Sequence, residues 1–426
     1  MLLKKKLTKF LKMNKTLNKI YPFTIYPLFA FPLLKENLSM IFLGVFGLLT
    51  IRNFCLNRIN KKFDKRWLFF SIPFFILIIS SVFRWSLLKN LGEINHALLF
   101  LVLPVFFYLS PKELFTKNKV LSYFKFLGYS SFLLILTYVV LFIINHSFNE
   151  FFATKYNSSL FRDFIYSKTV FFTIHPAYFT SILLFVTAFY IEQLKIKFNY
   201  FYVSLIVIFY IFTFLALTKL NIVLVNLLIT YSIFSELKTK MAYKIIVLSS
   251  LIVLCFLLIT ITPGMFLRIT ELINSLNTEP IGVAYDSTNI RKAIYTCDFY
   301  LLNDHLFTGV GFSEIKLELL NCFESNYTSN FYKDHLYLTH NYFIYIILGC
   351  GVFGLLPIIY FFYKNYTFLF RFKSLATSIF MLNTLLMCLI EDYFYRQNGI
   401  LFFLLISLSL FKFSQIENKE TNLFDK

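Results

Sequence analysis

The chain has 426 residues, of which 58% are hydrophobic and only 15% are charged. A soluble domain carries about 45–50% apolar and about 25% charged residues, so this composition excludes a soluble globular protein. Apolar runs of about 20 residues recur along the chain, and each is long enough to cross a bilayer. Because these runs are continuously apolar and do not alternate, they predict membrane-spanning α-helices and exclude a barrel.

In chain order, the apolar runs predict an all-α, polytopic transmembrane helix bundle of about twelve spans. The predicted spans are residues 20–34, 38–51, 67–83, 91–109, 120–144, 170–191, 199–217, 220–235, 243–262, 341–362, 375–391 and 398–413. The first follows a basic segment from Lys4 to Lys19 and has no small-residue cleavage site, so we expect it to be retained.

The chain has a net charge of +19, and the positions of its basic residues test this order of spans. An even number of spans places both termini on one side, and the Lys-rich start indicates that this side is the cytoplasm. The predicted inside loops are all basic. Their charges are Arg52, Arg58, Lys61, Lys62, Lys65 and Arg66; Lys112, Lys117 and Lys119; Lys195 and Lys197; Lys238, Lys240 and Lys244; Lys364, Arg371 and Lys373. The charge therefore indicates orientation in the membrane; no basic soluble domain is visible, and we expect no nucleic-acid partner.

One long polar segment separates two membrane regions. It covers residues 263–340, between an N-terminal region of about nine spans (1–262) and a C-terminal region of about three spans with a cytoplasmic tail (341–426). The order of spans places this loop outside the cytoplasm, and loops of this length are usually functional.

Two short helices are predicted inside this loop. Apolar residues recur at helical spacing over 290–302, after N-cap candidates that begin at Asp286. Residues 317–323 predict a second helix. Cys297 and Cys322 are the only cysteines of the loop, and whether they form a disulfide is open at this stage.

The chain has none of the phosphate-loop, dinucleotide, HExxH or GxSxG motifs of soluble enzymes. At the end of the loop, however, His340-Asn341 is followed after nine residues by Gly351-Val-Phe-Gly354. This spacing resembles the His-[Asn/Ser/Gln]-x9-Gly-x-x-[Gly/Thr/Tyr] signature of the O-antigen ligase family, which includes O-antigen polymerases and protein O-oligosaccharyltransferases.

Further elements between about residues 170 and 410 carry the same resemblance. The segment Asn303 to Phe312 resembles the family's element ahead of the histidine, and Arg291 stands where the family has an arginine. Thr218-Lys219 stands where many members have Ser-Arg, so the bidentate fork of arginine is missing there. Two more elements resemble one branch of the family: His175-Pro-Ala-Tyr178, and Glu391-Asp392 through Gly399.

The resemblance implies a membrane glycosyltransferase of surface-polysaccharide assembly. We expect an undecaprenyl-diphosphate-linked glycan as donor and, by the ligase-like spacing, lipid A-core as acceptor. The protein would be a multi-pass protein of the bacterial inner membrane, with its active site facing the periplasm. A repeat-unit polymerase, a protein O-oligosaccharyltransferase and, from another class, a polysaccharide transporter or flippase are alternatives. Intramembrane charges would favour a transporter, and the predicted spans hold almost none.

The expected catalytic residues are His340, Arg291 and Lys219. His340 would accept the acceptor's proton, and the two cations would stabilise the leaving diphosphate. The expected substrate-binding residues are His175, Tyr178, Asn341, Glu391 and Asp392. We expect no metal and no other cofactor.

Each of these residues also has an ordinary structural interpretation. His340, Glu391 and Asp392 would be interfacial polar residues, Arg291 a solvated helix residue and Lys219 a snorkelling anchor. His175 would cap a helix, and Gly351 and Gly354 would allow close packing. A metal site formed by His305, His335 and His340 matches no established ligand spacing.

Overall fold

The computed structural model describes residues 17, 19–56, 64–155, 158–166, 174–236, 240–280, 286–327, 330–332 and 336–417. This part of the chain is almost entirely helical; β1 (Thr154–Lys155) and β2 (Ser158–Ser159) form one short antiparallel pair. The predicted all-α membrane fold is confirmed. The basic start of the chain, Arg58, Lys61, Lys62, Lys238 and His335 lie outside the described residues.

Among the residues that the structure describes, eight helical stretches are long and apolar enough to cross a membrane. They are α3 (Glu36–Leu56), η3 (Lys65–Ser71) with α4 (Ile72–Phe83), α5 (Leu91–Ala97) with α6 (Leu99–Leu109), α7 (Lys117–Asn145), α9 (Pro176–Ile196), α12 (Met241–Ile261), α17 (Val352–Leu369) with η7 (Phe370–Phe372), and α19 (Gln397–Glu417). Three shorter apolar helices accompany them: α10 (Tyr200–Leu215), α11 (Lys219–Glu236) and α18 (Leu375–Ile390). The protein is therefore a multi-pass membrane protein.

Two predicted spans do not form one continuous helical stretch. Residues 20–34 form three short turns, η1 (Tyr21–Ile25), α2 (Tyr26–Phe29) and η2 (Phe31–Leu33), each with a proline in its first two positions. A proline inside a helix removes a hydrogen bond and clashes with the preceding turn, so each proline starts a new turn. The predicted span 341–362 is divided at Gly351 into α16 (Tyr342–Cys350) and α17.

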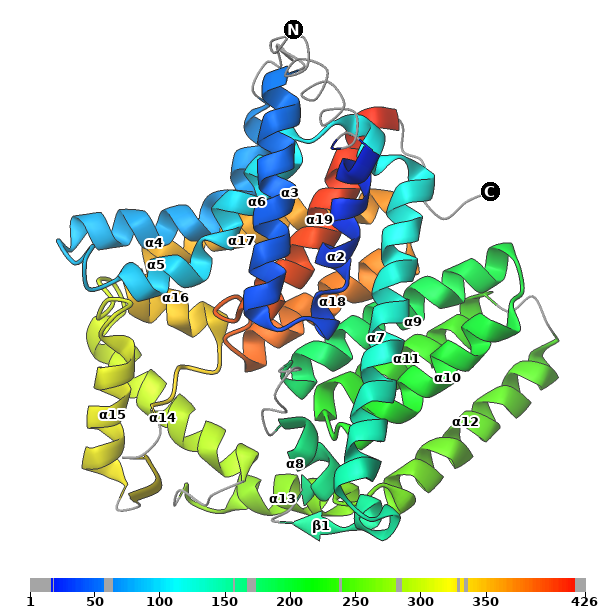
Figure 1. Ribbon diagram of the computed structural model, residues 1–426. Helices are drawn as coiled ribbons and strands as arrows, with labels where there is room; N and C mark the ends of the chain where they lie inside the picture. The colour runs from blue at the N-terminus through cyan, green and yellow to red at the C-terminus, as the bar shows by residue number, and fades with distance from the viewer. Residues whose placement is uncertain are drawn as a thin grey trace, which may run out of the picture.

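The polar loop folds into helices that lie along one end of the molecule, as Figure 1 shows. These helices are α13 (Met265–Asn277), α14 (Ser287–His305), α15 (Ile315–Asn326) and η6 (Asn330–Tyr332). The predicted helices 290–302 and 317–323 fall inside α14 and α15. The Asp286 carboxylate caps α14 by accepting the backbone N–H groups of Thr288 and Asn289. A disulfide between Cys297 and Cys322 joins α14 to α15.

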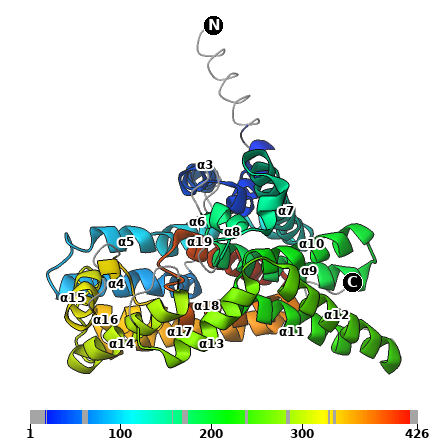
Figure 2. The ribbon, with the colours of Figure 1, turned by 90° about the horizontal axis from the view of Figure 1, so that it is seen from below.

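The bundle is layered around two buried helices. Most residues of α9 and α19 are buried, whereas α12 has no buried residue and lies at one edge (Figure 2). Gln397 at the start of α19 donates to the backbone oxygen of Glu36 at the start of α3, at 3.3 Å, so these helices begin at the same end of the bundle. Three short helices connect the longer ones: η4 (Lys112–Phe115), η5 (Phe148–Phe152) and α8 (Leu160–Tyr166).

Candidate active site

The predicted site residues gather where helix ends meet α14. His340 precedes α16, Glu391 and Asp392 follow α18, and Arg291 lies on the second turn of α14. The ring of His340 and the guanidinium of Arg291 both contact the Glu391 carboxylate: His340 Nδ1 lies 3.1 Å from Oε2, and Arg291 Nη2 pairs with Oε1. Residues separated by 51 and 100 positions are thereby joined in one cluster.

The backbone of His340 is held in an unusual conformation. Its φ of 46° lies in the left-handed region, which residues other than glycine, asparagine and aspartate rarely adopt. Asp392 stabilises it: one carboxylate oxygen accepts the His340 N–H at 3.0 Å, and the other accepts the Thr339 hydroxyl at 2.7 Å. The Tyr295 hydroxyl donates to the His340 carbonyl oxygen at 3.2 Å. Strained positions persist where surrounding contacts determine them, and they cluster at functional sites.

The environment of Glu391 fixes its charge and the histidine tautomer. Burial alone would raise the pKa of Glu391, but the His340 hydrogen bond and the Arg291 charge outweigh burial and lower that pKa to about 2. An ionised carboxylate can only accept hydrogen bonds, so Nδ1 of His340 must donate. Nε2 is then the basic nitrogen of the neutral ring. Burial raises the pKa of Asp392, although the positive charge that His340 carries when it is protonated and the Thr339 hydrogen bond act in the opposite direction.

The spacing between Asn341 and Gly351 is the length of α16. Asn341 begins that helix, and its side-chain oxygen accepts the N–H of Phe343 at 2.9 Å. Gly351 ends it with a φ of 79°, and a Cβ there would collide with the carbonyl oxygen of Phe307. The packing interpretation of Gly351 is confirmed, and the Asn341 side chain is a helix cap; a substrate contact of Asn341 stays a prediction.

His175 and Tyr178 lie at the start of α9, beside the segment that follows α18. The ring of Tyr178 stacks on Tyr393 with centroids 5.1 Å apart. His175 is the N-cap of α9, and its Nδ1 accepts the Ala177 N–H at 3.2 Å, so the capping interpretation is confirmed. The ring of His175 is edge-on to Tyr178 at 5.7 Å, and the two residues stay predicted substrate contacts.

Lys219 belongs to a second cluster at the first turn of α14. Its ammonium group lies 3.4 Å from Glu271 and 3.2 Å from the Thr288 hydroxyl. Glu271 also pairs with Arg268 at 2.8 Å and accepts the Ser287 hydroxyl at 3.1 Å. Lys219 is thus ion-paired, and its contact Thr288 lies about one helical turn before Arg291 on α14.

Two arginines near the site were missed in the sequence. Arg162 on α8 donates to the Ala216 carbonyl oxygen at 3.1 Å; burial and the nearby charge of Arg268 lower its pKa to about 10, so it stays charged at neutral pH. Arg396 is exposed in the connection from α18 to α19 and forms no ion pair with a described residue. Arg396 could have been found, because it lies between Glu391 and Gly399 in the family-like element.

Metal ligands do not gather here. Within the described ranges, no three His, Cys, Asp or Glu side chains lie close enough to hold a metal ion. His305 ends α14 and His335 lies outside the described residues, so the three-histidine arrangement is not tested.

The fold defines a multi-pass membrane protein in which polar residues from distant segments converge against α14. Residues 202–359 match the family described as O-antigen ligase. This match confirms the resemblance to that family seen in the sequence. This is a family of membrane glycosyltransferases of ligase and polymerase type. No curated protein matches the chain. Lys219, Arg291 and His340 lie inside the matched region, whereas His175, Tyr178, Glu391 and Asp392 lie outside it.

Proposed function

We propose that the protein is a ligase that transfers a glycan from an undecaprenyl-diphosphate-linked donor to lipid A-core. The observation that carries this proposal is the His340–Glu391–Arg291 cluster at the junction of the polar loop and the membrane-spanning helices. A lipid-linked donor and a water-side acceptor have to meet at such a junction. The ligase is favoured over other family activities by the His-Asn and Gly-x-x-Gly spacing.

The cluster suits a base-assisted displacement. The neutral His340 ring accepts the acceptor hydroxyl's proton at Nε2 while Glu391 holds Nδ1–H, so positive charge forms beside a carboxylate. The acceptor oxygen bonds to the anomeric carbon, and the bond from that carbon to the diphosphate oxygen breaks. The diphosphate leaves with the bonding electron pair.

Fixed cations compensate the charge on the leaving diphosphate. Arg291 has five N–H donors and uses one nitrogen for Glu391, which leaves donors for a phosphate oxygen. Lys219 lies near the first turn of α14 and is one-third exposed. Because side chains supply this charge, we propose that no metal is needed; undiminished turnover in a chelator would support this, and loss restored by a divalent cation would contradict it.

We propose that the site faces the periplasm from the bacterial inner membrane, with both termini cytoplasmic. The same topology makes residues 1–262 and 341–426 membrane regions and 263–340 a periplasmic loop. The Cys297–Cys322 disulfide supports it, because disulfides persist in oxidising compartments. In a variant with the free cysteines replaced by serine, an impermeant thiol reagent should label Leu317→Cys and not Lys197→Cys. Labelling with the opposite sidedness would invert the topology.

The function is tested with purified protein, lipid-linked glycan and lipid A-core. Glycosylated lipid A-core identifies a ligase. Longer lipid-linked glycan made without lipid A-core identifies a polymerase, and transfer to an acceptor protein identifies an oligosaccharyltransferase. Movement of the donor across vesicles without any new glycosidic bond identifies a transporter. Each of these last three results overturns the ligase.

A further inference from the structure

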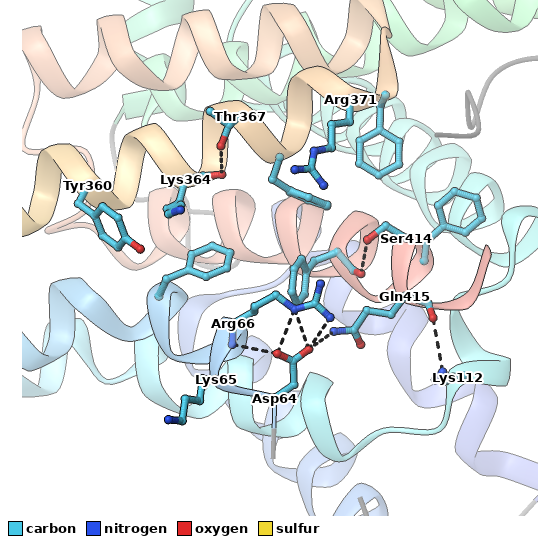
Figure 3. A pocket seen from close by; sticks show the side chains of 15 residues that line it. Asp64, Lys65, Arg66, Lys112, Tyr360, Lys364, Thr367, Arg371, Ser414 and Gln415 are labelled. Atoms are coloured by element: carbon cyan, nitrogen blue, oxygen red, sulfur yellow. Dashed lines mark hydrogen bonds and ion pairs between the residues drawn. The ribbon is translucent and has the colours of Figure 1, made fainter. Parts of the chain in front are cut away.

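A second polar cavity lies at the opposite end of the bundle, and Figure 3 shows it from close by. Its volume is about 820 Å³, and Gln415 near the end of α19 lines it. The α19 helix begins at Gln397, so at 1.5 Å per residue about 27 Å separates its two ends. The cavity is therefore distinct from the His340 cluster.

Five cations and one carboxylate line this cavity: Lys65, Arg66, Lys112, Lys364, Arg371 and Asp64. Asp64 is committed within the protein, because it pairs with Arg66 at 2.8 Å and accepts the Gln415 amide at 3.0 Å. The other four cations form no ion pair with any residue that the structure describes. The lining therefore carries an excess of four positive charges, and an anion is the complementary ligand.

The cations stand on opposite sides of the cavity. Figure 3 shows Lys364 and Arg371 on the α17 side and Arg66 on the facing side. Arg66 lies over the Phe411 ring at 5.8 Å, and Lys364 over the Tyr360 ring at 5.2 Å. Arg66 shares its charge with Asp64, but the four cations without a carboxylate partner repel one another, and an anion among them removes that repulsion.

Aromatic rings form the rest of the lining. They include Phe69, Phe368, Phe372 and Phe411, which lie near the ends of three of the long apolar helical stretches. A site for a free anion needs polar donors alone, whereas a lipid headgroup also places glycerol and the first acyl carbons against apolar surface. Basic pockets between transmembrane helices bind phosphate headgroups in this way.

We infer that this cavity binds the phosphate headgroup of an anionic phospholipid. The phosphate lies between Arg66 and the Lys364–Arg371 side, and the acyl chains leave along the aromatic rings. All five cations come from segments that the charge pattern places in the cytoplasm, so the lipid would belong to the cytoplasmic leaflet. This site is independent of the proposed transferase reaction.

The protein contains its own reporter for this site. Trp67 is buried, and its ring is edge-on to Phe411 at 4.9 Å. The chain has two tryptophans, so Trp85→Phe leaves Trp67 as the sole fluorophore. Phosphatidylglycerol with brominated acyl chains should quench Trp67 at a lower mole fraction than brominated phosphatidylcholine, by about tenfold.

A double variant locates the binding. In the Trp85→Phe background, Lys364→Gln with Arg371→Gln removes two cations that have no carboxylate partner in the described structure. Because each charge is worth up to about fivefold, the loss of two is enough to raise the half-quenching fraction of phosphatidylglycerol about tenfold, to the level of phosphatidylcholine. Lys197→Gln with Lys240→Gln is the matched control, because both lysines are exposed on predicted inside loops; it should change nothing.

Three results would overturn the assignment. Equal quenching by the two lipids, or no quenching by either, removes the headgroup specificity. An equal loss in the control variant makes the effect one of general surface charge. Abolition of phosphatidylglycerol quenching by millimolar inorganic phosphate identifies a small-anion site. If the double variant does not fold, Arg371→Gln alone should raise the half-quenching fraction about fivefold.

Discussion

Glu391 and Glu271 each lie between two basic side chains, and both clusters touch the first two turns of α14. They differ in exposure: the Glu271 side chain is 1% exposed and that of Arg268 is 6%, whereas Glu391 is 11% and Arg291 33% exposed. The first cluster is closed apart from Lys219, and the second is open to a ligand. The same arrangement of charges therefore serves to position a helix in one place and to present chemical groups in the other.

Replacing His340 should produce the largest effect on activity. His340→Ala removes the proposed base, which is typically worth about 10²–10⁴-fold, or roughly 3–5 kcal/mol of transition-state stabilisation. Turnover of purified, folded enzyme with lipid-linked glycan and acceptor measures this loss. The control is His305→Ala at the end of α14, which should leave turnover unchanged. Wild-type turnover by His340→Ala would make His340 a structural residue.

The two glutamates should separate stability from activity. Glu271→Gln leaves the buried Arg268 without a carboxylate, which should cost about 3 kcal/mol of stability. Thermal unfolding of the two variants shows the difference: Glu271→Gln should lower Tm strongly, while Glu391→Gln should chiefly lower turnover, because Nδ1 of His340 loses its ionised partner. Equal losses of Tm in both variants would contradict the distinction between a closed and an open cluster.

Arg291 should act on the donor and not on folding. Arg291→Ala removes a proposed diphosphate contact and should lower kcat/KM for the lipid-linked donor by about 10²-fold, a typical loss for one charge-stabilising donor. Because the change also leaves Glu391 with one partner fewer, Arg291→Lys is the control that retains the charge; it should recover part of the rate. Unchanged transfer by Arg291→Ala would show that Arg291 does not act on the donor and that its role is limited to the ion pair with Glu391.

Lys219 should have a smaller effect, because it is shared with Glu271. Lys219→Ala should lower donor kcat/KM by about tenfold, and Lys219→Arg should be tolerated within a few-fold, since it keeps the charge and adds a bidentate fork. Steady-state kinetics with varied donor concentration measure both. A loss of Tm without any change in kinetics would show that Lys219 only anchors the loop.

Features that depend on neighbouring residues could be predicted from the sequence, and those that depend on distant pairs could not. The helices α14 and α15 follow from local caps and periodicity, and the interval from Asn341 to Gly351 follows from one helix. The pairing of Arg291 with Glu391 spans 100 positions. No sequence motif around Glu271 indicates that it pairs with Lys219 and Arg268. The basic cavity is likewise assembled from segments that are far apart in sequence, so the sequence showed its basic residues but not that they line one cavity.

A buried carboxylate on α14 gives the smallest predicted effect. Asp298 is fully buried, and neither of its oxygens has a hydrogen-bond partner among the described residues. Burial, and then the charge of Asp392, raise the pKa of Asp298 well above its usual range. The unfolded chain therefore releases this proton at lower pH than the folded protein does. As pH rises above the unfolded pKa, this group increasingly favours unfolding.

Asp298→Asn removes the ionisation and should therefore stabilise the protein more at high pH than at low pH. At pH 5, which is about one unit above the ordinary pKa of an aspartate, the gain should be about 1 kcal/mol, because one pH unit of differential protonation is worth about 1.4 kcal/mol. The difference in Tm between variant and wild type, measured at pH 5 and pH 8, should grow with pH. Glu324→Gln on the exposed side of α15 is the matched control and should show no such trend. A variant that loses stability equally at both pH values would mean that Asp298 has a partner that requires its carboxyl group.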